Sequence, residues 1–278
     1  MYARITAMRH ALLCFLAACL SVPAAAQTEQ ARTYEARVFE DQSGDRLQYR
    51  LFRPADYDLS ERYPLVVYLH GGGGRGDDNL KQLVGGNAYG TGLFSSDKVQ
   101  QKHPSFVLAP QTSSATAADG WGGLNRPPRD SWDRTKTNAE FLPDPAGEPI
   151  DLLVRLIDSL NAEFSLDANR IYVTGQSMGG YGSWGLITRY PYLFAAAAPI
   201  CGGGDPLAAK RIEIPIWAFH GADDKVVPVQ QSRAMIEALK ANAAKPRYTE
   251  FPGVGHNSWE KAYSNPELVE WLFAQRRP

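Results

Sequence analysis

The sequence predicts an α/β fold with a mostly parallel central sheet, and two observations carry this prediction. Residues 65–69 and 171–174 are nearly continuous apolar runs, which is typical of strands covered on both faces. Leucine and isoleucine recur at helical spacing over 152–160, directly before the second run. A helix that leads into a buried strand indicates right-handed crossovers, and these place helices on both faces of the sheet.

The remaining elements follow in chain order. Residues 33–39 and 46–52 alternate in polarity on either side of a turn-rich stretch, which predicts an antiparallel hairpin at the N-terminal end of the sheet. Further strands are expected at 105–109, 194–200, 214–219 and 247–251, and further helices after Ser177, at 232–239 and at 266–275.

Residues 1–26 predict an export signal. Arg4 and Arg9 precede an apolar core at 11–22, and small residues end at Ala26, after which we expect cleavage. The core is short for a bilayer span. In the alternative reading, Leu16 to Cys19 resembles a bacterial lipoprotein box, which would leave a protein anchored by lipid on Cys19. Both readings predict an exported protein, periplasmic or extracellular.

The expected mature chain, residues 27–278, has the length of one sizeable domain. The whole sequence has a formal net charge of −1 and no block rich in lysine or arginine, which argues against nucleic acid and anionic membranes as partners. Cys201 is the one cysteine outside the predicted signal, so no internal disulfide is expected. It ends an apolar run and is expected to be a buried, inert thiol.

A serine lies where a strand meets a helix, in the motif Gly175-Gln176-Ser177-Met178-Gly179. The pattern G-x-S-x-G alone is weak, because it arises by chance in glycine-rich chains. Its position between an apolar strand and a helix is the context that a nucleophile requires. The glycines allow a sharp turn without side-chain collisions, and such a turn pushes the hydroxyl of Ser177 out above the sheet.

Four glycines follow His70 at the end of the buried strand 65–69. They could form only a flexible turn. They also allow backbone N–H groups to approach a developing negative oxygen closely. For such an oxyanion hole we expect Gly72 as the loop donor, with Gly73 next, and Met178 as the second donor. His70 is expected to support the loop through hydrogen bonds rather than act as the base.

Two later motifs supply a carboxylate and an imidazole. Asp224 is selected by the spacing H-G-x-x-D-x-x-V-P after a buried strand, although a carboxylate there is often only a turn cap. His256 follows the last expected strand on a loop. A serine hydroxyl needs a base that removes its proton, and a carboxylate holds that imidazole in the right tautomer. The order Ser177, Asp224, His256, each after a strand, fits this chemistry.

The stretches LHGGGGRGDDN, GQSMGGYGSW, FHGADDKVVP and GVGHNSW together resemble bacterial α/β-hydrolase esterases of the dienelactone-hydrolase and prolyl-oligopeptidase-like group, near the feruloyl and acetylxylan esterases. The resemblance covers 33–278. It implies one α/β-hydrolase domain and a serine carboxylesterase that acts through an acyl-serine. It also implies Ser177, Asp224 and His256 as the triad, with no metal or organic cofactor.

Residues 112–149 form an irregular insertion rich in Gly, Pro and Asp. It could be a surface loop held in place by aromatic side chains, or it could form the rim of a substrate-binding site. In the second reading Trp121 or Trp132 stacks on an aromatic or sugar group, and Trp259 near His256 is a third candidate contact. The expected partner is therefore a small-molecule or polysaccharide-linked ester, including feruloyl or acetyl esters of plant polysaccharide.

Two other functions are compatible with the same residues. A serine peptidase of the prolyl-oligopeptidase type would share the site, but the chain has no repeats that could build a propeller gate. A non-catalytic binding protein on a hydrolase scaffold would not need serine, aspartate and histidine in this order.

Overall fold

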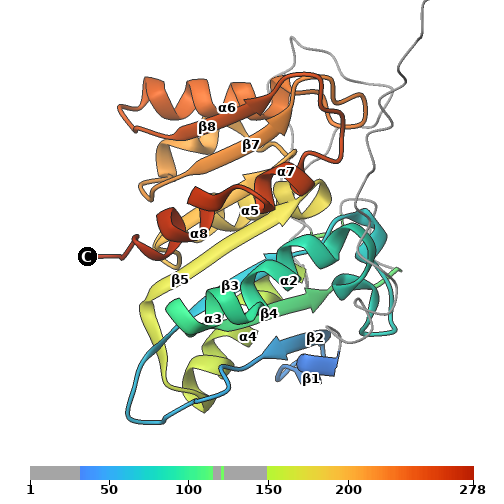
Figure 1. Ribbon diagram of the computed structural model, residues 1–278, viewed down its shortest axis with the longest axis vertical. Helices are drawn as coiled ribbons and strands as arrows, with labels where there is room; N and C mark the ends of the chain where they lie inside the picture. Colours follow the sequence, from blue (N-terminus) through green and yellow to red (C-terminus); the bar gives the residue numbers. More distant parts are fainter. Residues whose placement is uncertain (1–31, 115–119, 122–148) are drawn as a thin grey trace, which may run out of the picture.

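The computed structural model describes residues 32–114, 120–121 and 149–278, and its centre is an eight-stranded sheet (Figure 1). The spatial order of the strands is β1-β2-β4-β3-β5-β6-β7-β8. Their bounds are β1 Glu35–Glu40, β2 Arg46–Phe52, β3 Tyr63–Leu69, β4 Phe106–Gln111, β5 Leu166–Gln176, β6 Ala196–Ile200, β7 Trp217–Gly221 and β8 Arg247–Phe251.

The sheet is parallel except at its N-terminal edge. β1 pairs antiparallel with β2, and β2 pairs antiparallel with β4. The other neighbours are parallel, from β4 and β3 through to β8. The predicted mostly parallel sheet with an antiparallel hairpin is confirmed. Because the strands from β4 to β8 run in the same direction, their carboxyl ends and the loops after them meet at one edge.

Helices cover both faces of this sheet (Figure 1). One face packs against α4 Pro149–Glu163, α5 Met178–Arg189 and α6 Gln230–Ala241, and the other against α2 Ala88–Ser95, α3 Asp97–Lys102, α7 Trp259–Tyr263 and α8 Pro266–Phe273. Short 3-10 helices lie at Gly72–Gly74 (η1), Lys81–Leu83 (η2), Gly85–Asn87 (η3) and Pro206–Arg211 (η6).

The central strand β3 shows why the sheet needs cover on both sides. Leu65, Val67 and Leu69 belong to the apolar cluster shared with α4 and α5, whereas Val66 and Tyr68 belong to the cluster shared with α2, α7 and α8. All five side chains are fully buried. A strand with apolar residues at consecutive positions contributes side chains to a core on each face of the sheet, as the continuous apolar run predicts.

Three helices had no counterpart in the sequence prediction: α2, α3 and α7. α2 reads AYGTGLFS, and its two glycines lower its intrinsic helix propensity. Packing stabilises it instead, because Phe94 is fully buried against Tyr263 of α7. Tertiary contacts of this kind override local propensity and cannot be read from one segment alone.

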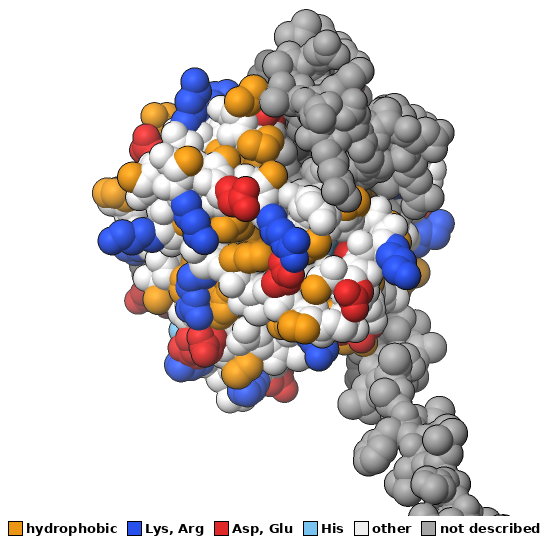
Figure 2. Space-filling view, turned by 90° about the horizontal axis from the view of Figure 1, so that it is seen from above, with side chains coloured by type: hydrophobic (Ala, Val, Ile, Leu, Met, Phe, Trp, Pro, Cys, Tyr) orange, Lys and Arg blue, Asp and Glu red, His pale blue; other side chains and the backbone are white. Residues whose placement is uncertain are grey.

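Positive and negative side chains are interspersed over the described surface seen in Figure 2. Within the described ranges no helix combines the length and the apolar character needed to cross a membrane. The predicted signal at 1–26 and most of the 112–149 insertion lie outside the described residues, so the signal, the processing site and the domain boundaries stay predictions.

Helix α4 offers a test of the packing. The side chain of Ile157 is buried in the core, and the next residue, Asp158, is exposed. Ile157→Ala should lower the free energy of unfolding by about 2–5 kcal/mol, because it removes buried methyl groups and leaves a cavity. Asp158→Ala is the matched control and should change it by less than about 0.5 kcal/mol. Urea unfolding of both variants measures this, and equal effects would contradict the assigned helix face.

Candidate active site

Ser177 occupies a strained turn between β5 and α5. Its backbone has φ 54° and ψ −115°, a region that residues with side chains rarely adopt. A Cβ on Gly179 would lie 1.9 Å from the carbonyl oxygen of Leu69, and one on Gly175 would lie 2.5 Å from that of Gly179. The turn therefore accepts only glycine at these two positions. Ser177 is partly exposed while its neighbours Gln176 and Met178 are buried.

The structure brings Ser177, His256 and Asp224 together. The Nε2 atom of His256 lies 2.9 Å from Oγ of Ser177, and its Nδ1 atom lies 2.7 Å from Oδ2 of Asp224. The three residues come from the loops that follow β5, β7 and β8. Their meeting is a consequence of the parallel strands, which deliver three distant chain segments to the same edge of the sheet.

Asp224 is held as a buried carboxylate. Its Oδ1 atom accepts hydrogen bonds from the backbone N–H groups of Val226 (2.8 Å) and Val227 (2.9 Å). Burial acts to raise the pKa of Asp224, but hydrogen bonds from His220, His256 and the Val227 backbone outweigh it and hold the pKa well below its usual range. An ionised Asp224 requires a proton on Nδ1 of His256, so Nε2 faces the serine hydroxyl as an acceptor.

The loop after β3 is fixed by buried side chains. Nδ1 of His70 donates to the carbonyl oxygen of Gly71 (2.7 Å), and Nε2 accepts the backbone N–H of Thr112 (3.1 Å). Asn87 Oδ1 accepts the N–H of Gly71 (3.0 Å), and Trp121 Nε1 donates to the carbonyl oxygen of His70 (3.1 Å). His70 is fully buried, so it supports the loop and lies away from solvent, as the sequence suggested.

Gly72 and Gly73 are the first residues of η1, and Met178 is the first residue of α5. The first N–H groups of a helix have no partner inside the helix and carry partial positive charge. A Cβ built on Gly72 or Gly73 meets no atom of the described residues within 4 Å, so that part of the chain leaves the space beside this loop open. The contact between Gly179 and Leu69 places the start of α5 against the end of β3, which carries the loop.

The three tryptophans predicted to touch substrate have different positions. Trp121 is fully buried and packs on the ring of His70, with ring centroids 4.9 Å apart. A buried ring that also donates to the loop backbone supports the loop and offers no surface for stacking, so the observed position differs from the predicted one. Trp259 is half-buried and lies edge-on to His256, 5.4 Å between ring centroids. Trp132 lies outside the described residues.

Cys201 is the third potential metal donor near Asp224 and His256, and the three donor atoms lie within 4.8 Å of one another. Burial raises the pKa of the Cys201 thiol to about 12, so it stays protonated at neutral pH and is a poor ligand. The facing atoms of Asp224 and His256 are already joined by a hydrogen bond. These residues therefore fit an inert thiol beside a hydrogen-bonded pair better than they fit a cation site.

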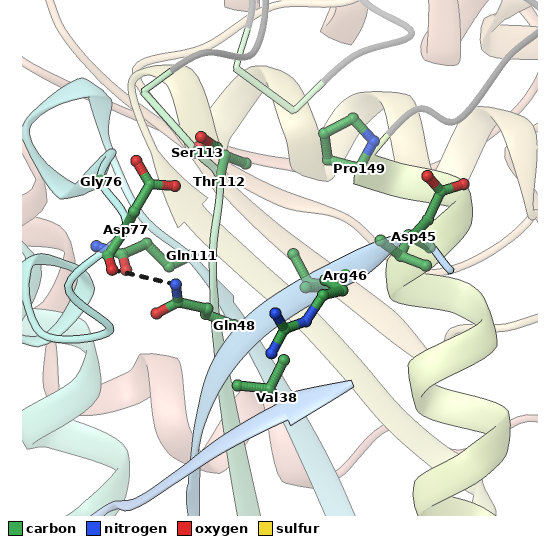
Figure 3. A pocket seen from close by; sticks show the side chains of 12 residues that line it. Val38, Asp45, Arg46, Gln48, Gly76, Asp77, Gln111, Thr112, Ser113 and Pro149 are labelled. Atoms are coloured by element: carbon green, nitrogen blue, oxygen red, sulfur yellow. Dashed lines mark hydrogen bonds between the residues drawn. The ribbon is translucent and has the colours of Figure 1, made fainter. Parts of the chain in front are cut away.

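A separate cavity of about 350 Å³ lies near the β1–β2 hairpin (Figure 3). Its lining includes Arg46, Gln48, Asp77 and Thr112, and Gln48 Nε2 donates to the carbonyl oxygen of Asp77 (3.1 Å). Thr112 also contacts His70. Ser177, Asp224 and His256 are not in the lining, so this hollow and the three-residue cluster are distinct features.

Sequence reasoning did not assign roles to two residues that shape the site. Asn87 binds the N–H of Gly71 and also accepts from the Tyr68 hydroxyl (3.3 Å), and it lies in a stretch for which no element was predicted. His220 lies 3.3 Å from Oδ2 of Asp224 through its Nε2 atom. The motif H-G-x-x-D contains His220, so its spacing was a signal for this contact.

The sheet order, the helices on both faces and the turn at Ser177 define an α/β-hydrolase. Residues 132–266 match the model of the dienelactone hydrolase family. In sequence, the chain resembles the dienelactone-hydrolase and prolyl-oligopeptidase-like group of this fold. The match includes Ser177, Asp224 and His256, whereas the glycine loop after His70 precedes it.

Named relatives are mostly esterases. The chain is 24% identical over 223 residues to the probable feruloyl esterase C of Aspergillus niger. This alignment covers 77% of this chain and 68% of that protein. It is 33% identical over 154 residues to poly(3-hydroxyalkanoate) depolymerase C of Paucimonas lemoignei. This alignment covers 55% of this chain and 31% of that protein. A crystal structure of a thermostable esterase has 41% identity and a TM-score of 0.78, and the match covers 90% of this chain and 64% of that one.

The buried His70 predicts a pH dependence of stability. Burial lowers the pKa of His70 to about 4, so between this value and the ordinary value of about 6.5 the unfolded chain binds a proton that the folded protein does not. Stability is therefore complete above pH of about 6.5 and falls toward pH 4, by about 3 kcal/mol from this residue.

His70→Gln removes this titration and should flatten the dependence, as measured by urea unfolding at pH 7 and pH 4.5. Gln101→Ala, at an exposed residue of α3 that has no ionisable group, is the control and should keep the wild-type slope. An unchanged slope in His70→Gln would show that this residue does not control acid stability.

Proposed function

We propose that this chain is an exported serine carboxylesterase that hydrolyses esters through an acyl-serine intermediate. The observation that carries the proposal is the pair of hydrogen bonds linking Ser177 to His256 and His256 to Asp224. An imidazole that accepts from a serine hydroxyl and donates to a buried carboxylate is arranged to take up the serine proton during attack. The esterase relatives support the same reaction class.

In the first half-reaction Ser177 Oγ attacks the ester carbonyl carbon while its proton passes to Nε2 of His256. The carbonyl oxygen becomes negative and is stabilised by the N–H groups of Gly72 and Met178, with Gly73 as the alternative loop donor. Asp224 stabilises the imidazolium without taking its proton. His256 then protonates the leaving alcohol, and the acyl group remains on Ser177.

In the second half-reaction water attacks the acyl-serine, with His256 as base, and the carboxylic acid leaves. The strained turn at Ser177 assists both halves because it fixes Oγ relative to His256 and to the N–H of Met178. No metal or organic cofactor is needed for these steps, since each proton transfer and each charge has a protein group assigned to it.

For the substrate we propose feruloyl or acetyl esters of plant polysaccharide. The relative named as a feruloyl esterase and the short match to a bifunctional acetylxylan esterase/xylanase of Neocallimastix patriciarum, 31% identical over 85 residues and 12% of that protein, support this class. Export, which the N-terminal sequence predicts, would place the enzyme with such polymers. Trp259, half-buried beside His256, is the described aromatic side chain best placed to contact an acyl group.

Ser177→Ala tests the nucleophile. Its kcat with p-nitrophenyl acetate should fall by about 10⁴-fold or more, because the acyl intermediate cannot form. The thermal transition should be retained, and Ser159→Ala, at an exposed serine of α4, serves as a serine control. Normal turnover by Ser177→Ala would refute the mechanism. Faster cleavage of peptide anilides than of aryl esters by the wild type would favour the peptidase alternative.

Trp259→Ala tests the acyl contact. If Trp259 touches an aromatic acyl group, kcat/KM should fall about fivefold or more for methyl ferulate, an effect typical of aromatic pairs, and less than about twofold for p-nitrophenyl acetate. Tyr192→Ala, at a side chain 74% exposed, is the control. An equal loss on both esters would show that Trp259 only supports His256.

A further inference from the structure

The strand that precedes Asp224 carries a second buried histidine, His220 in β7. Its side chain is fully buried, as is that of Asp224. Nε2 of His220 lies 3.0 Å from the carbonyl oxygen of Val227 and 3.3 Å from Oδ2 of Asp224. Asp224 therefore lies between two histidines, His220 on the inner side and His256 on the outer side.

The surroundings of His220 determine where its proton lies. Nε2 faces a carbonyl oxygen and a carboxylate oxygen, and both can only accept. A bare Nε2 would repel them, so Nε2 carries a proton and donates. Nδ1 lies 2.7 Å from Oγ of Ser232, a hydroxyl that either donates or accepts. In either case the Nε2 proton is shared between the two acceptors that it faces, the Val227 carbonyl oxygen and Oδ2 of Asp224.

Counting donors shows what His220 adds to the carboxylate. Oδ1 of Asp224 accepts the two backbone N–H groups of Val226 and Val227, while Oδ2 accepts from His256 and His220. Without His220, the one donor on Oδ2 within the described part of the chain would be His256, whose ring moves protons in the proposed reaction. His220 does not touch the substrate, so a donor from this side can hold the orientation of Oδ2 through every step.

We propose that His220 is a positioning residue of the hydrolytic site: its Nε2–H group fixes Oδ2 of Asp224 in the direction of His256. The proposal rests on the proposed function, in which Asp224 orients His256. The contacts of Ser232 extend the same assembly, because its Oγ also lies 2.9 Å from the carbonyl oxygen of Gly202, the other acceptor within reach of its single proton. Gly202 packs directly against Gly180 of α5, the helix that Ser177 precedes.

Replacing His220 by glutamine or by asparagine distinguishes a positioning role from a packing role, because the two amide side chains differ in length. Glutamine places its N–H₂ group near the position of Nε2 in histidine, whereas asparagine places it near Nδ1 and cannot reach Asp224. His220→Gln should keep kcat for p-nitrophenyl acetate within about threefold of wild type. His220→Asn should lower kcat about tenfold or more with KM within about twofold, the size seen when an outer hydrogen-bond partner of a functional group is lost.

The rates are normalised to functional sites by the burst of p-nitrophenol, so a misfolded fraction lowers the burst and leaves the rate per site unchanged. Equal rates per site in His220→Gln and His220→Asn would overturn the proposal. A double-mutant cycle tests it again: with Asp224→Asn present, His220→Asn should lower the residual kcat by no more than about twofold. A further tenfold loss in that background would also overturn it.

Ser177→Ala keeps this test separate from the proposed function. If Ser177→Ala retains activity, the acyl-serine mechanism itself fails. If Ser177→Ala is inactive and the two His220 variants are alike, the mechanism stands and only the role of His220 is refuted.

Discussion

The close approach of α5 to the end of β3 is the constraint on which the site depends. The first turn of the helix lies so near the Leu69 carbonyl that position 179 has no space for a Cβ. This contact forces the chain at Ser177 into left-handed backbone geometry, which lifts its side chain out of the sheet edge. The same contact places the first turn of α5, which begins at Met178, against the end of β3. One packing contact thus positions the Ser177 hydroxyl and, in the proposed mechanism, the backbone donors beside it.

The second requirement is a carboxylate that keeps its charge and its direction while buried. A buried ionised group is costly unless hydrogen bonds replace its lost hydration. Among the residues that the structure describes, Asp224 faces four donors, two from the backbone after β7 and two from histidine rings. Since the backbone donors belong to its own turn, they fix Oδ1 of the carboxylate without any contribution from His256. His256 then meets an acceptor whose position is already determined.

The fold was largely predictable from the sequence, because its signals are long apolar runs and one strong helical pattern. The run at 65–69 and the leucine spacing of α4 predicted buried elements, and both formed. The helix α2 was missed because Gly90 and Gly92 weaken its local signal, while its stability comes from Phe94 packing against distant Tyr263. Such contacts depend on residues far away in the chain.

The functional site likewise contains residues that could be predicted from the sequence and residues that could not. Ser177, Asp224 and His256 could be found because each follows a strand in a short motif, and the parallel sheet then brings them together. The position of Trp121 could not be predicted, since composition does not say whether a tryptophan in an irregular stretch faces solvent or the core. Its N–H finds the His70 carbonyl and the ring is buried. The motif at 220–224 identified Asp224 but did not show which way His220 points.

The most direct measurement of the central claim is the site of covalent modification by a fluorophosphonate. Such a reagent phosphonylates a serine only where a base and oxyanion donors assist attack. Peptide mass mapping of the treated protein should find one adduct, on Ser177, and prior unfolding in urea should abolish it. An adduct on a different serine, or no adduct on folded protein that hydrolyses esters, would contradict the account.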